Sequence, residues 1–355
     1  MKKNRLPFSA ISIDEKKPEF GRRTSFADVG RLNSGRPTSE RRPISKKLIK
    51  SSTYQYTKKS YGQSRSGNRS FSKNNYKNMG ENKIIPPAEG VVRIIPLGGV
   101  EEIGKNMTAI EIDNDIIIID AGMHFSNEET PGVDYVIPNT TYLEEHKEKI
   151  RALIITHGHL DHIGGVPLVL SRIGNPPVYS RNISVLLMRK RQAEFPQLPA
   201  MKENIVEKDG MITCGKIKVR FFGVTHTIPD ALGIIIETKH GWIVSPGDYK
   251  LDQVDGIVTS KEEKEYSIFD KAKVLLLMTD STNIENEGFS LSETKVHQGL
   301  ENLIKKINGR IIIAAFSSSI TRLVYVIKVA ESLNKKVAID GRSMKTNIDV
   351  AIEAN

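Results

Sequence analysis

The segment Leu153–Gly165, LIITHGHLDHIGG, contains four side chains that can bind a metal ion: His157, His159, Asp161 and His162. An apolar run precedes them and a glycine pair follows. This pattern predicts a loop at the carboxyl end of a buried strand, where open α/β sheets tend to place their sites. His157 and His159 point the same way in an extended turn, whereas Asp161 and His162 lie about one turn further on. The spacing therefore predicts two neighbouring metal ions rather than one.

Imidazole and carboxylate groups are the ligands that zinc and similar metals prefer, and a catalytic centre leaves one position open for water. Two ions roughly 3.5–4 Å apart can activate a water molecule and hold both oxygens of a displacement reaction. The alternative is a polar loop whose histidines cap the following helix. The HxHxDH pattern between an apolar strand and a glycine pair favours the metal centre.

Side chains able to bind a metal also follow other predicted strands. Asp120, His157, His226, Asp248 and Asp280 each stand just past the end of an apolar run. Strand ends at one edge of a sheet can converge on a site even when they are far apart in sequence. The runs are 116–119, 153–155, 217–222, 242–245 and 274–278, the last predicted as a buried strand. Further strands are predicted at 310–315 and 336–339, and helices at 292–307 and 321–333.

The composition separates a basic N-terminal segment from the rest of the chain. Residues 1–90 contain 21 Lys and Arg against 7 Asp and Glu, a net charge of +14, whereas the other residues carry 31 against 35. Residues 1–86 are rich in Ser, Asn and Gly and are predicted to be a disordered tail. Tyrosines interleaved with basic residues in this tail predict RNA contacts, the alternative being a solvated linker.

The sequence also predicts the cellular compartment. Cys214 is the single cysteine of the 355 residues, so no intrachain disulfide can form and a reducing cytoplasm is expected. No apolar stretch reaches the length of a membrane span or of a signal-peptide core. We therefore expect a cytoplasmic protein without a membrane partner.

The stretch HGHLDHIGG resembles the signature of the metallo-β-lactamase fold. The stretches LGGVEEIGKNM, GVTHTIPDALG, PGDYKLDQVDG, TDSTNIENEGF and VAIDGRSM are similar to ribonuclease J, of the β-CASP subgroup. The resemblance implies an α/β fold, an incomplete αββα sandwich followed by the start of a β-CASP domain. The expected domains are a tail over 1–86, a metallo-β-lactamase domain over 87–290 and a partial β-CASP domain over 291–355. The family's sequences continue beyond Asn355, so a truncated chain is expected.

The resemblance implies six ligands for two Zn²⁺ ions, with Mn²⁺ as the alternative metal. They are His157, His159 and His226 for one ion, Asp161 and His162 for the other, and Asp248 between both.

The resemblance also implies roles for residues that do not bind the metal. Asp120 would orient a ligand histidine, and Asp280 matches an acidic motif beside the metals. Asp120, Asp161, Asp248 and Asp280 are accordingly the expected catalytic residues. Gly341, Arg342 and Ser343 match a segment near the RNA path, and their expected role is substrate binding.

The activity implied by the resemblance is hydrolysis of phosphodiesters in single-stranded RNA. The family acts as a 5′-to-3′ exonuclease and also as an endonuclease in RNA processing and decay, as dimers or tetramers. Ser319 and Thr321 depart from the family, which usually has Asn and His there. Two alternatives remain: an inactive remnant that binds RNA or a partner, and a hydrolase of small thioesters. Measurements of metal content and RNA turnover distinguish these two alternatives from the ribonuclease.

Overall fold

The computed structural model describes residues 88–125, 131–254 and 256–354. The basic tail predicted over residues 1–86 lies outside the described residues. No described helix is long and apolar enough to cross a membrane.

The first sheet has its strands in the order β1-β2-β3-β6-β7-β8. The strands are β1 (Val92–Gly98), β2 (Met107–Ile112), β3 (Asp115–Ile119), β6 (Ile150–Ile154), β7 (Val178–Ser180) and β8 (Glu203–Ile205). The first three are antiparallel, and the last three run parallel to β3. β2 and β3 form a hairpin, and Asp113 adopts a left-handed φ of 54° in its turn.

The second sheet has the order β15-β12-β11-β10-β9. Its strands are β9 (Met211–Cys214), β10 (Ile217–Gly223), β11 (Leu232–Thr238), β12 (Gly241–Ser245) and β15 (Val274–Leu277). β9 to β12 form an antiparallel meander, and β15 pairs in parallel with β12. The prediction that β15 is buried was wrong. Val274, Leu275 and Leu277 are 44–54% exposed, because β15 is the edge strand of this sheet in the described part of the chain.

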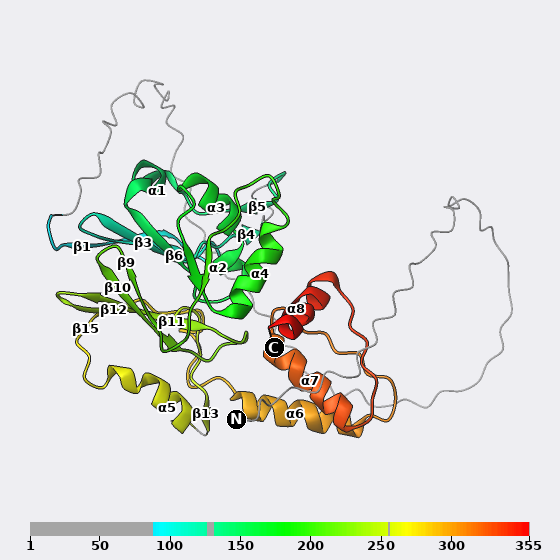
Figure 1. The fold of residues 1–355 in the computed structure, drawn as a ribbon. Helices are drawn as coiled ribbons and strands as arrows, with labels where there is room; N and C mark the ends of the chain where they lie inside the picture. The colour runs from blue at the N-terminus through cyan, green and yellow to red at the C-terminus, as the bar shows by residue number, and fades with distance from the viewer. Residues whose placement is uncertain (1–87, 126–130, 255, 355) are drawn as a thin grey trace, which may run out of the picture. The chain divides into compact units, whose positions relative to one another are not determined.

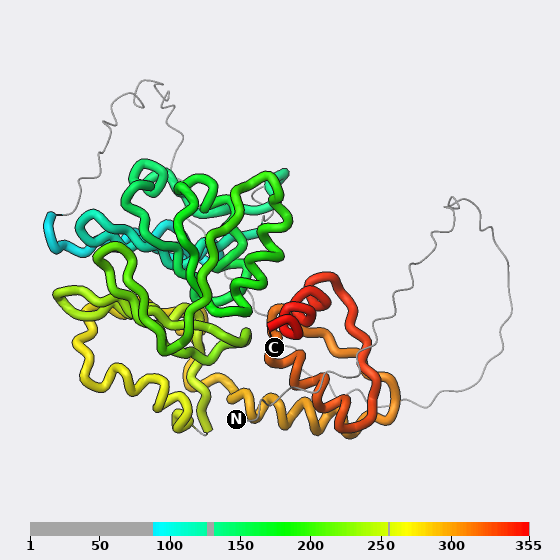
Figure 2. The backbone as a smooth tube through the Cα atoms, viewed as in Figure 1, coloured from blue at the N-terminus to red at the C-terminus, as the bar shows by residue number. Residues whose placement is uncertain are grey.

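The helices and short strands lie between the strands of these sheets or follow the last of them (Figure 1). The helices are α1 (Thr141–Glu145), η1 (Lys147–Lys149), α2 (Leu160–Ile163), α3 (Val166–Arg172), α4 (Asn182–Gln192), α5 (Ser260–Tyr266), η2 (Ser267–Phe269), α6 (Glu293–Lys306), α7 (Ile320–Ser332) and α8 (Arg342–Glu353). The short strands are β4 (His124–Phe125), β5 (Tyr135–Val136), β13 (Gln253–Val254) and β14 (Ile257–Val258). The last three helices, orange to red in Figure 2, follow the second sheet in the chain.

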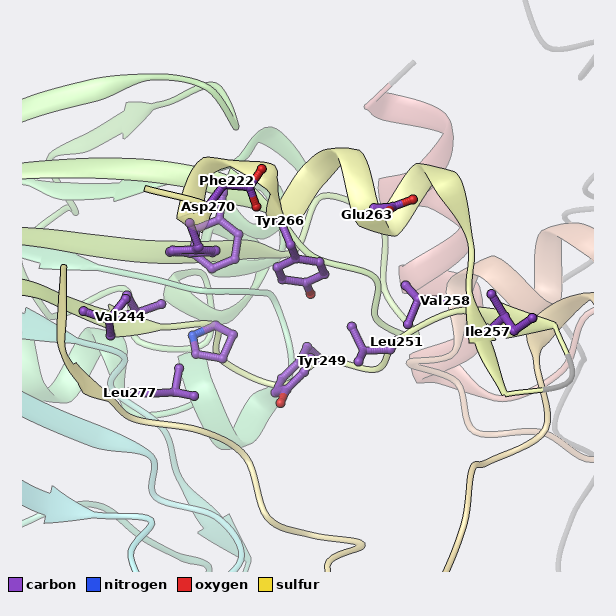
Figure 3. Close-up of a pocket in the computed structure, with 13 residues that line it drawn as sticks. Phe222, Val244, Tyr249, Leu251, Ile257, Val258, Glu263, Tyr266, Asp270 and Leu277 are labelled. Atoms are coloured by element: carbon purple, nitrogen blue, oxygen red, sulfur yellow. The ribbon is translucent and has the colours of Figure 1, made fainter. Parts of the chain in front are cut away.

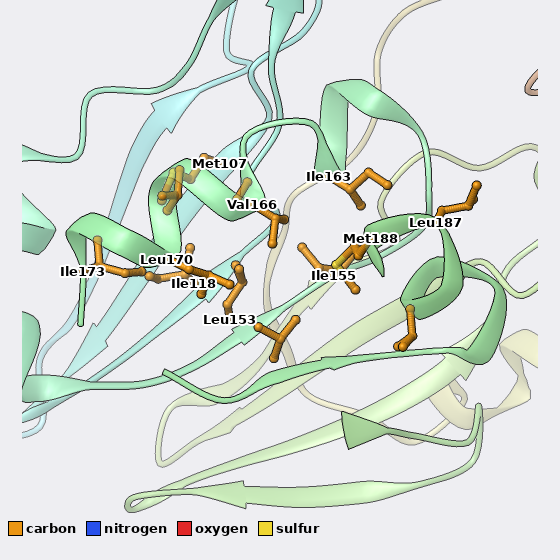
Figure 4. Close-up of a cluster of buried hydrophobic side chains, with 14 of the residues drawn as sticks. Met107, Ile118, Leu153, Ile155, Ile163, Val166, Leu170, Ile173, Leu187 and Met188 are labelled. Atoms are coloured by element: carbon orange, nitrogen blue, oxygen red, sulfur yellow. The ribbon is translucent and has the colours of Figure 1, made fainter. Parts of the chain in front are cut away.

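Two apolar layers explain why the β3 isoleucines are all buried. Ile117 and Ile119 face the second sheet, where they pack with residues such as Ile234 and Ile243. Ile116 and Ile118 face the opposite way, into a cluster with α3 and α4 (Figure 4). Alternate side chains of a strand point to opposite faces, so β3 is buried on both sides. Helices therefore cover the outer face of the first sheet, and the second sheet covers its inner face.

The outer face of the second sheet packs against α5 and η2. The Phe222 ring lies 6.0 Å from that of Tyr266 and 5.1 Å from that of Phe269, measured between centroids. Beside these rings is a cavity of about 670 Å³ whose lining includes Val244 and Leu277 (Figure 3). The order of layers is thus helix, sheet, sheet, helix, which confirms the predicted αββα fold class. No ligand side chain predicted from the sequence lines this cavity.

The strands predicted at 310–315 and 336–339 are not formed in the described residues. Both segments have no regular secondary structure and pair with no neighbouring strand there, and Ile312 is 91% exposed. A strand requires a partner for its backbone N–H and C=O groups, and apolar patterning alone does not supply one. The helices predicted at 292–307 and 321–333 are confirmed as α6 and α7.

Glu111 is a fully buried carboxylate in β2, and its partners come from three other elements. It accepts hydrogen bonds from Tyr142 Oη at 2.6 Å, Arg93 Nη1 at 3.1 Å and Lys149 Nζ at 3.4 Å. We predict that Glu111→Ala lowers the free energy of unfolding by about 3 kcal/mol, because it leaves two cations without their buried partner. Urea unfolding measures this change. Glu145→Ala, at an exposed position of α1, is the control and should change stability by less than about 0.5 kcal/mol. Equal effects of the two substitutions would contradict the assignment.

Candidate metal centre

The loops after β6 and β10 bring three histidine rings together. His157 is fully buried, and its Nε2 lies 3.0 Å from His159 Nδ1. His226, which follows β10, places its Nε2 3.2 Å from the same Nδ1 atom. The ligand atoms of the three residues all lie within 4.8 Å of one another. This is the set predicted from the sequence for one metal ion.

A second cluster adjoins the first and shares a member with it. His157, His162 and Asp248 also have ligand atoms within 4.8 Å of one another. His162 Nε2 lies 3.3 Å from Asp248 Oδ1 and 3.4 Å from Asp161 Oδ2. Asp161 therefore lies beside the cluster, and its predicted role as a ligand stays a prediction, whereas the third member of the compact group is His157. The sequence prediction had assigned His157 to the first ion alone.

Asp120 links the two strands that carry the site. It follows β3 directly, and its Oδ1 accepts a hydrogen bond from the backbone N–H of Thr156, just past the neighbouring β6, at 2.8 Å. Its Oδ2 lies 2.7 Å from His162 Nδ1. This contact leaves His162 Nε2 facing Asp161 and Asp248. The geometry is that required for the predicted orienting role of Asp120.

Asn106 and Thr156 are site residues that the sequence reasoning missed. Asn106 Nδ2 lies 3.3 Å from Asp161 Oδ2 and 3.1 Å from His162 Nε2. Thr156 Oγ1 donates to Asp120 Oδ2 at 2.9 Å and lies 3.1 Å from His157 Nδ1. Asn106 lies in the stretch LGGVEEIGKNM and Thr156 in LIITHGHLDHIGG. Neither was predicted as a site residue, because amide and hydroxyl side chains are not typical metal ligands.

Burial keeps most of the imidazoles neutral. It lowers the pKa of His157 well below the usual range, and the neighbouring His162 ring lowers it further. Burial also lowers the pKa of His159 and takes that of His226 to about 4. A neutral imidazole has a free ring nitrogen lone pair, which is the state that binds a metal. Three rings are therefore ready to act as ligands at neutral pH.

The second cluster contains ionised groups of both signs. Burial would lower the pKa of His162, but the charge and hydrogen bond of Asp120, with hydrogen bonds to the other two carboxylates, together raise this pKa well above the usual value. Burial would raise the pKa values of Asp161 and Asp248, but the hydrogen bond and charge of His162, with the other neighbouring groups, together lower both.

The residues present fit divalent cations. Their donor set consists of imidazole nitrogens and carboxylate oxygens, the ligands of zinc and related metals. His159 Nε2 is buried without a hydrogen-bond partner among the described residues. In addition, His159 Nδ1 faces two other ring nitrogens and can share one proton with only one of them.

The remaining predicted residues lie outside both clusters. Asp280 Oδ1 accepts hydrogen bonds within its own loop, from Thr282 N at 2.7 Å and Thr282 Oγ1 at 2.6 Å. Gly341, Arg342 and Ser343 are exposed at the start of α8. The structure therefore does not bring these four residues together with the histidines, and their roles stay predictions.

Two segments of the chain match known protein families, and most of the chain is similar to curated proteins. Residues 101–259 match the metallo-beta-lactamase superfamily, and residues 308–355 match the family described as "Ribonuclease J, beta-CASP domain". The chain is 37% identical over 273 residues to "Ribonuclease J" of Mycoplasma pneumoniae, which is 76% of this chain and 48% of that protein. It is 39% identical over 270 residues to "Ribonuclease J" of Thermus thermophilus, 74% of this chain and 47% of that protein.

The chain therefore spans about half the length of these curated relatives. A solved structure of a protein of unknown function from Enterococcus faecalis shares the fold, with a TM-score of 0.52, 18% identity and 70% of each chain covered. The chain has a metallo-β-lactamase fold, and the resemblance to ribonuclease J predicted from its motifs is confirmed.

Gly122 allows the backbone of two loops to approach closely at the site. Its N–H donates to Asn106 O at 2.9 Å, and a Cβ atom at this position would lie 1.6 Å from Asp161 O. We predict that Gly122→Ala lowers the free energy of unfolding by about 3 kcal/mol and weakens zinc binding at least about tenfold, because Asp161 must move. Urea unfolding and competition with a chromophoric chelator measure the two effects.

The control for Gly122→Ala is Gly299→Ala, in α6, where an added Cβ meets nothing within 4 Å. This change should raise stability by roughly 0.5–1 kcal/mol through helix propensity and leave zinc affinity unchanged. Wild-type zinc affinity in Gly122→Ala would show that the close approach does not matter for the site.

Proposed function

We propose that this chain, which is similar to ribonuclease J over about three quarters of its length, is the metal-binding part of a ribonuclease that hydrolyses phosphodiester bonds. The observation that carries the proposal is the pair of ligand clusters that share His157 at the end of β6. Both clusters lie within the region that matches the metallo-beta-lactamase superfamily. A structural polar loop would not require three neutral imidazoles whose ring nitrogens face one another.

We propose two zinc ions as the resident metals, with manganese as the alternative. His157, His159 and His226 would hold one ion, and Asp161, His162 and Asp248 would hold the other, with His157 and Asp248 close to both. Two such ions would supply an activated water molecule and stabilise negative charge on the phosphoryl oxygens.

The protein's own groups have defined tasks in this proposal. Asp120 holds the Nδ1 proton of His162 and so presents Nε2 to the site. Asn106 fixes the Asp161 carboxylate with its side-chain amide. Thr156 contacts both Asp120 and His157 through one hydroxyl. These three residues thus set the direction of the ligand atoms before any substrate arrives.

Single-stranded RNA is the proposed substrate. The match of residues 308–355 to the β-CASP domain of ribonuclease J favours RNA over a small thioester. We further propose 5′-to-3′ exonuclease action with additional endonuclease action, in RNA processing and decay in the cytoplasm. Substrate contacts are assigned to Gly341–Ser343 and to the basic tail, and a catalytic role beside the metals to Asp280. A dimer or tetramer is the proposed assembly.

Cleavage of a 5′-monophosphorylated, 3′-labelled single-stranded RNA in the presence of zinc or manganese tests the function. We predict mononucleotide release by the wild-type chain. His159→Ala should lower the rate by more than about a hundredfold, because removing a ligand exceeds the 10–100-fold effect typical of residues that only support ligands.

His240→Ala is the matched control, since His240 lies at an exposed turn and contacts Gly90 O. This variant should cleave RNA at the wild-type rate. Zinc binding by the wild-type chain without any RNA cleavage would instead support an inactive binding remnant. Cleavage that persists in His159→Ala would contradict the assignment of the site.

A further inference from the structure

The loops that carry His226 and Asp248 are joined by a bridge between their backbones. Lys250 N donates a hydrogen bond to Thr225 O at 2.8 Å, and the two residues form an isolated antiparallel pair. Thr225 directly precedes His226, and Lys250 follows Asp248 by two residues. The separation of these two ligands, one from each cluster, therefore depends on where Lys250 is held.

The Lys250 side chain is held by a carboxylate from the helical segment. Its Nζ donates to Glu293 Oε1 at 2.6 Å, and Glu293 is the first residue of α6. The same oxygen accepts a hydrogen bond from Arg322 Nη2 of α7 at 3.2 Å. A second contact lies close by, because Gln253 Nε2 donates to Ser290 O at 2.9 Å. The segment after Asp248 is thus attached to the start of α6 at two points.

Glu293 is itself fixed in place. Ser292 caps α6, accepting a hydrogen bond from Lys295 N, and an acidic residue in the first turn is favoured by the helix dipole. His297, one turn later, lies 3.5 Å from the other Glu293 oxygen and stacks on Tyr325 of α7, with ring centroids 3.8 Å apart. Burial would raise the pKa of Glu293, but Lys250 outweighs it and lowers this pKa, so the carboxylate is ionised at neutral pH.

We propose that Glu293 is a positioning residue for the metal centre: by holding Lys250, it fixes the Thr225–Lys250 bridge that spaces His226 from Asp248. The inference rests on the proposed metal-binding function and deepens it. It assigns α6 and α7 a part in shaping the metal centre, in addition to any contact with substrate. The affinity for metal then depends on the ion pair between Lys250 and Glu293.

Cobalt(II) titration followed by visible absorption tests this role without requiring catalysis. Glu293→Gln keeps the size of the side chain and removes its charge. We expect its cobalt dissociation constant to rise about tenfold, with an altered ligand-field spectrum, because the ligand loops lose their fixed spacing. Glu293→Asp retains the charge and should restore part of the affinity. Glu301→Gln, on the same helix but bonded to Lys305 and Tyr325, should match the wild type.

A double-mutant cycle with Lys250→Met tests the path through the lysine. If Glu293 acts through Lys250, the losses of affinity should not add. The double variant should then bind cobalt as tightly as whichever of Glu293→Gln and Lys250→Met has the lower affinity. Additive losses, or a wild-type affinity and spectrum in Glu293→Gln, would overturn the inference while leaving the proposed function intact. An equal loss in Glu301→Gln would also overturn it, by showing a general effect on α6. Failure of the wild-type chain to bind cobalt would overturn both proposals.

Discussion

Ring nitrogens of neighbouring imidazoles repel one another unless a proton or a cation lies between them. His159 Nδ1 lies 3.0 Å from His157 Nε2 and 3.2 Å from His226 Nε2, so a single proton satisfies only one of the two contacts. Burial keeps these rings neutral, as the low pKa values of His157 and His226 indicate. A divalent cation held by the three residues would remove the repulsion. The fold holds the three rings at this spacing.

The two packed sheets provide the rigidity that this spacing needs. β3 and β6 are parallel neighbours in the first sheet, so Asp120 and the loop carrying His157 leave the sheet at the same edge. Asp120 adopts a left-handed φ of 62°, which is unfavourable for a residue with a Cβ atom. Its hydrogen bonds to Thr156 and its contact with His162 offset that strain. Beyond the sheets, the Lys250–Glu293 pair extends the support to α6.

Local patterns in the sequence indicated which residues belong to the candidate site. They did not indicate how these residues divide between the two ligand clusters. Histidine spacing within one loop is a short-range property, so His157, His159 and His162 could be identified directly. The place of His157 in both clusters, and the contacts of Asn106, depend on how distant loops meet, which no periodicity encodes. The same limit applies to the fold. The apolar runs of β3, β6, β10 and β12 predicted strands, whereas the exposure of β15 and the unpaired segments 310–315 and 336–339 depend on which strands lie alongside.

The central proposal is that two metal ions bind side by side, with His157 a ligand of the first and His162 and Asp248 ligands of the second. Equilibrium dialysis against zinc, followed by elemental analysis of the protein, tests it most directly. We predict about two zinc ions per wild-type chain and about one in His157→Ala, because the first site loses a ligand while Asp161, His162 and Asp248 remain. A wild-type chain that binds no zinc, or a His157→Ala chain that retains two ions, would contradict the two-metal site.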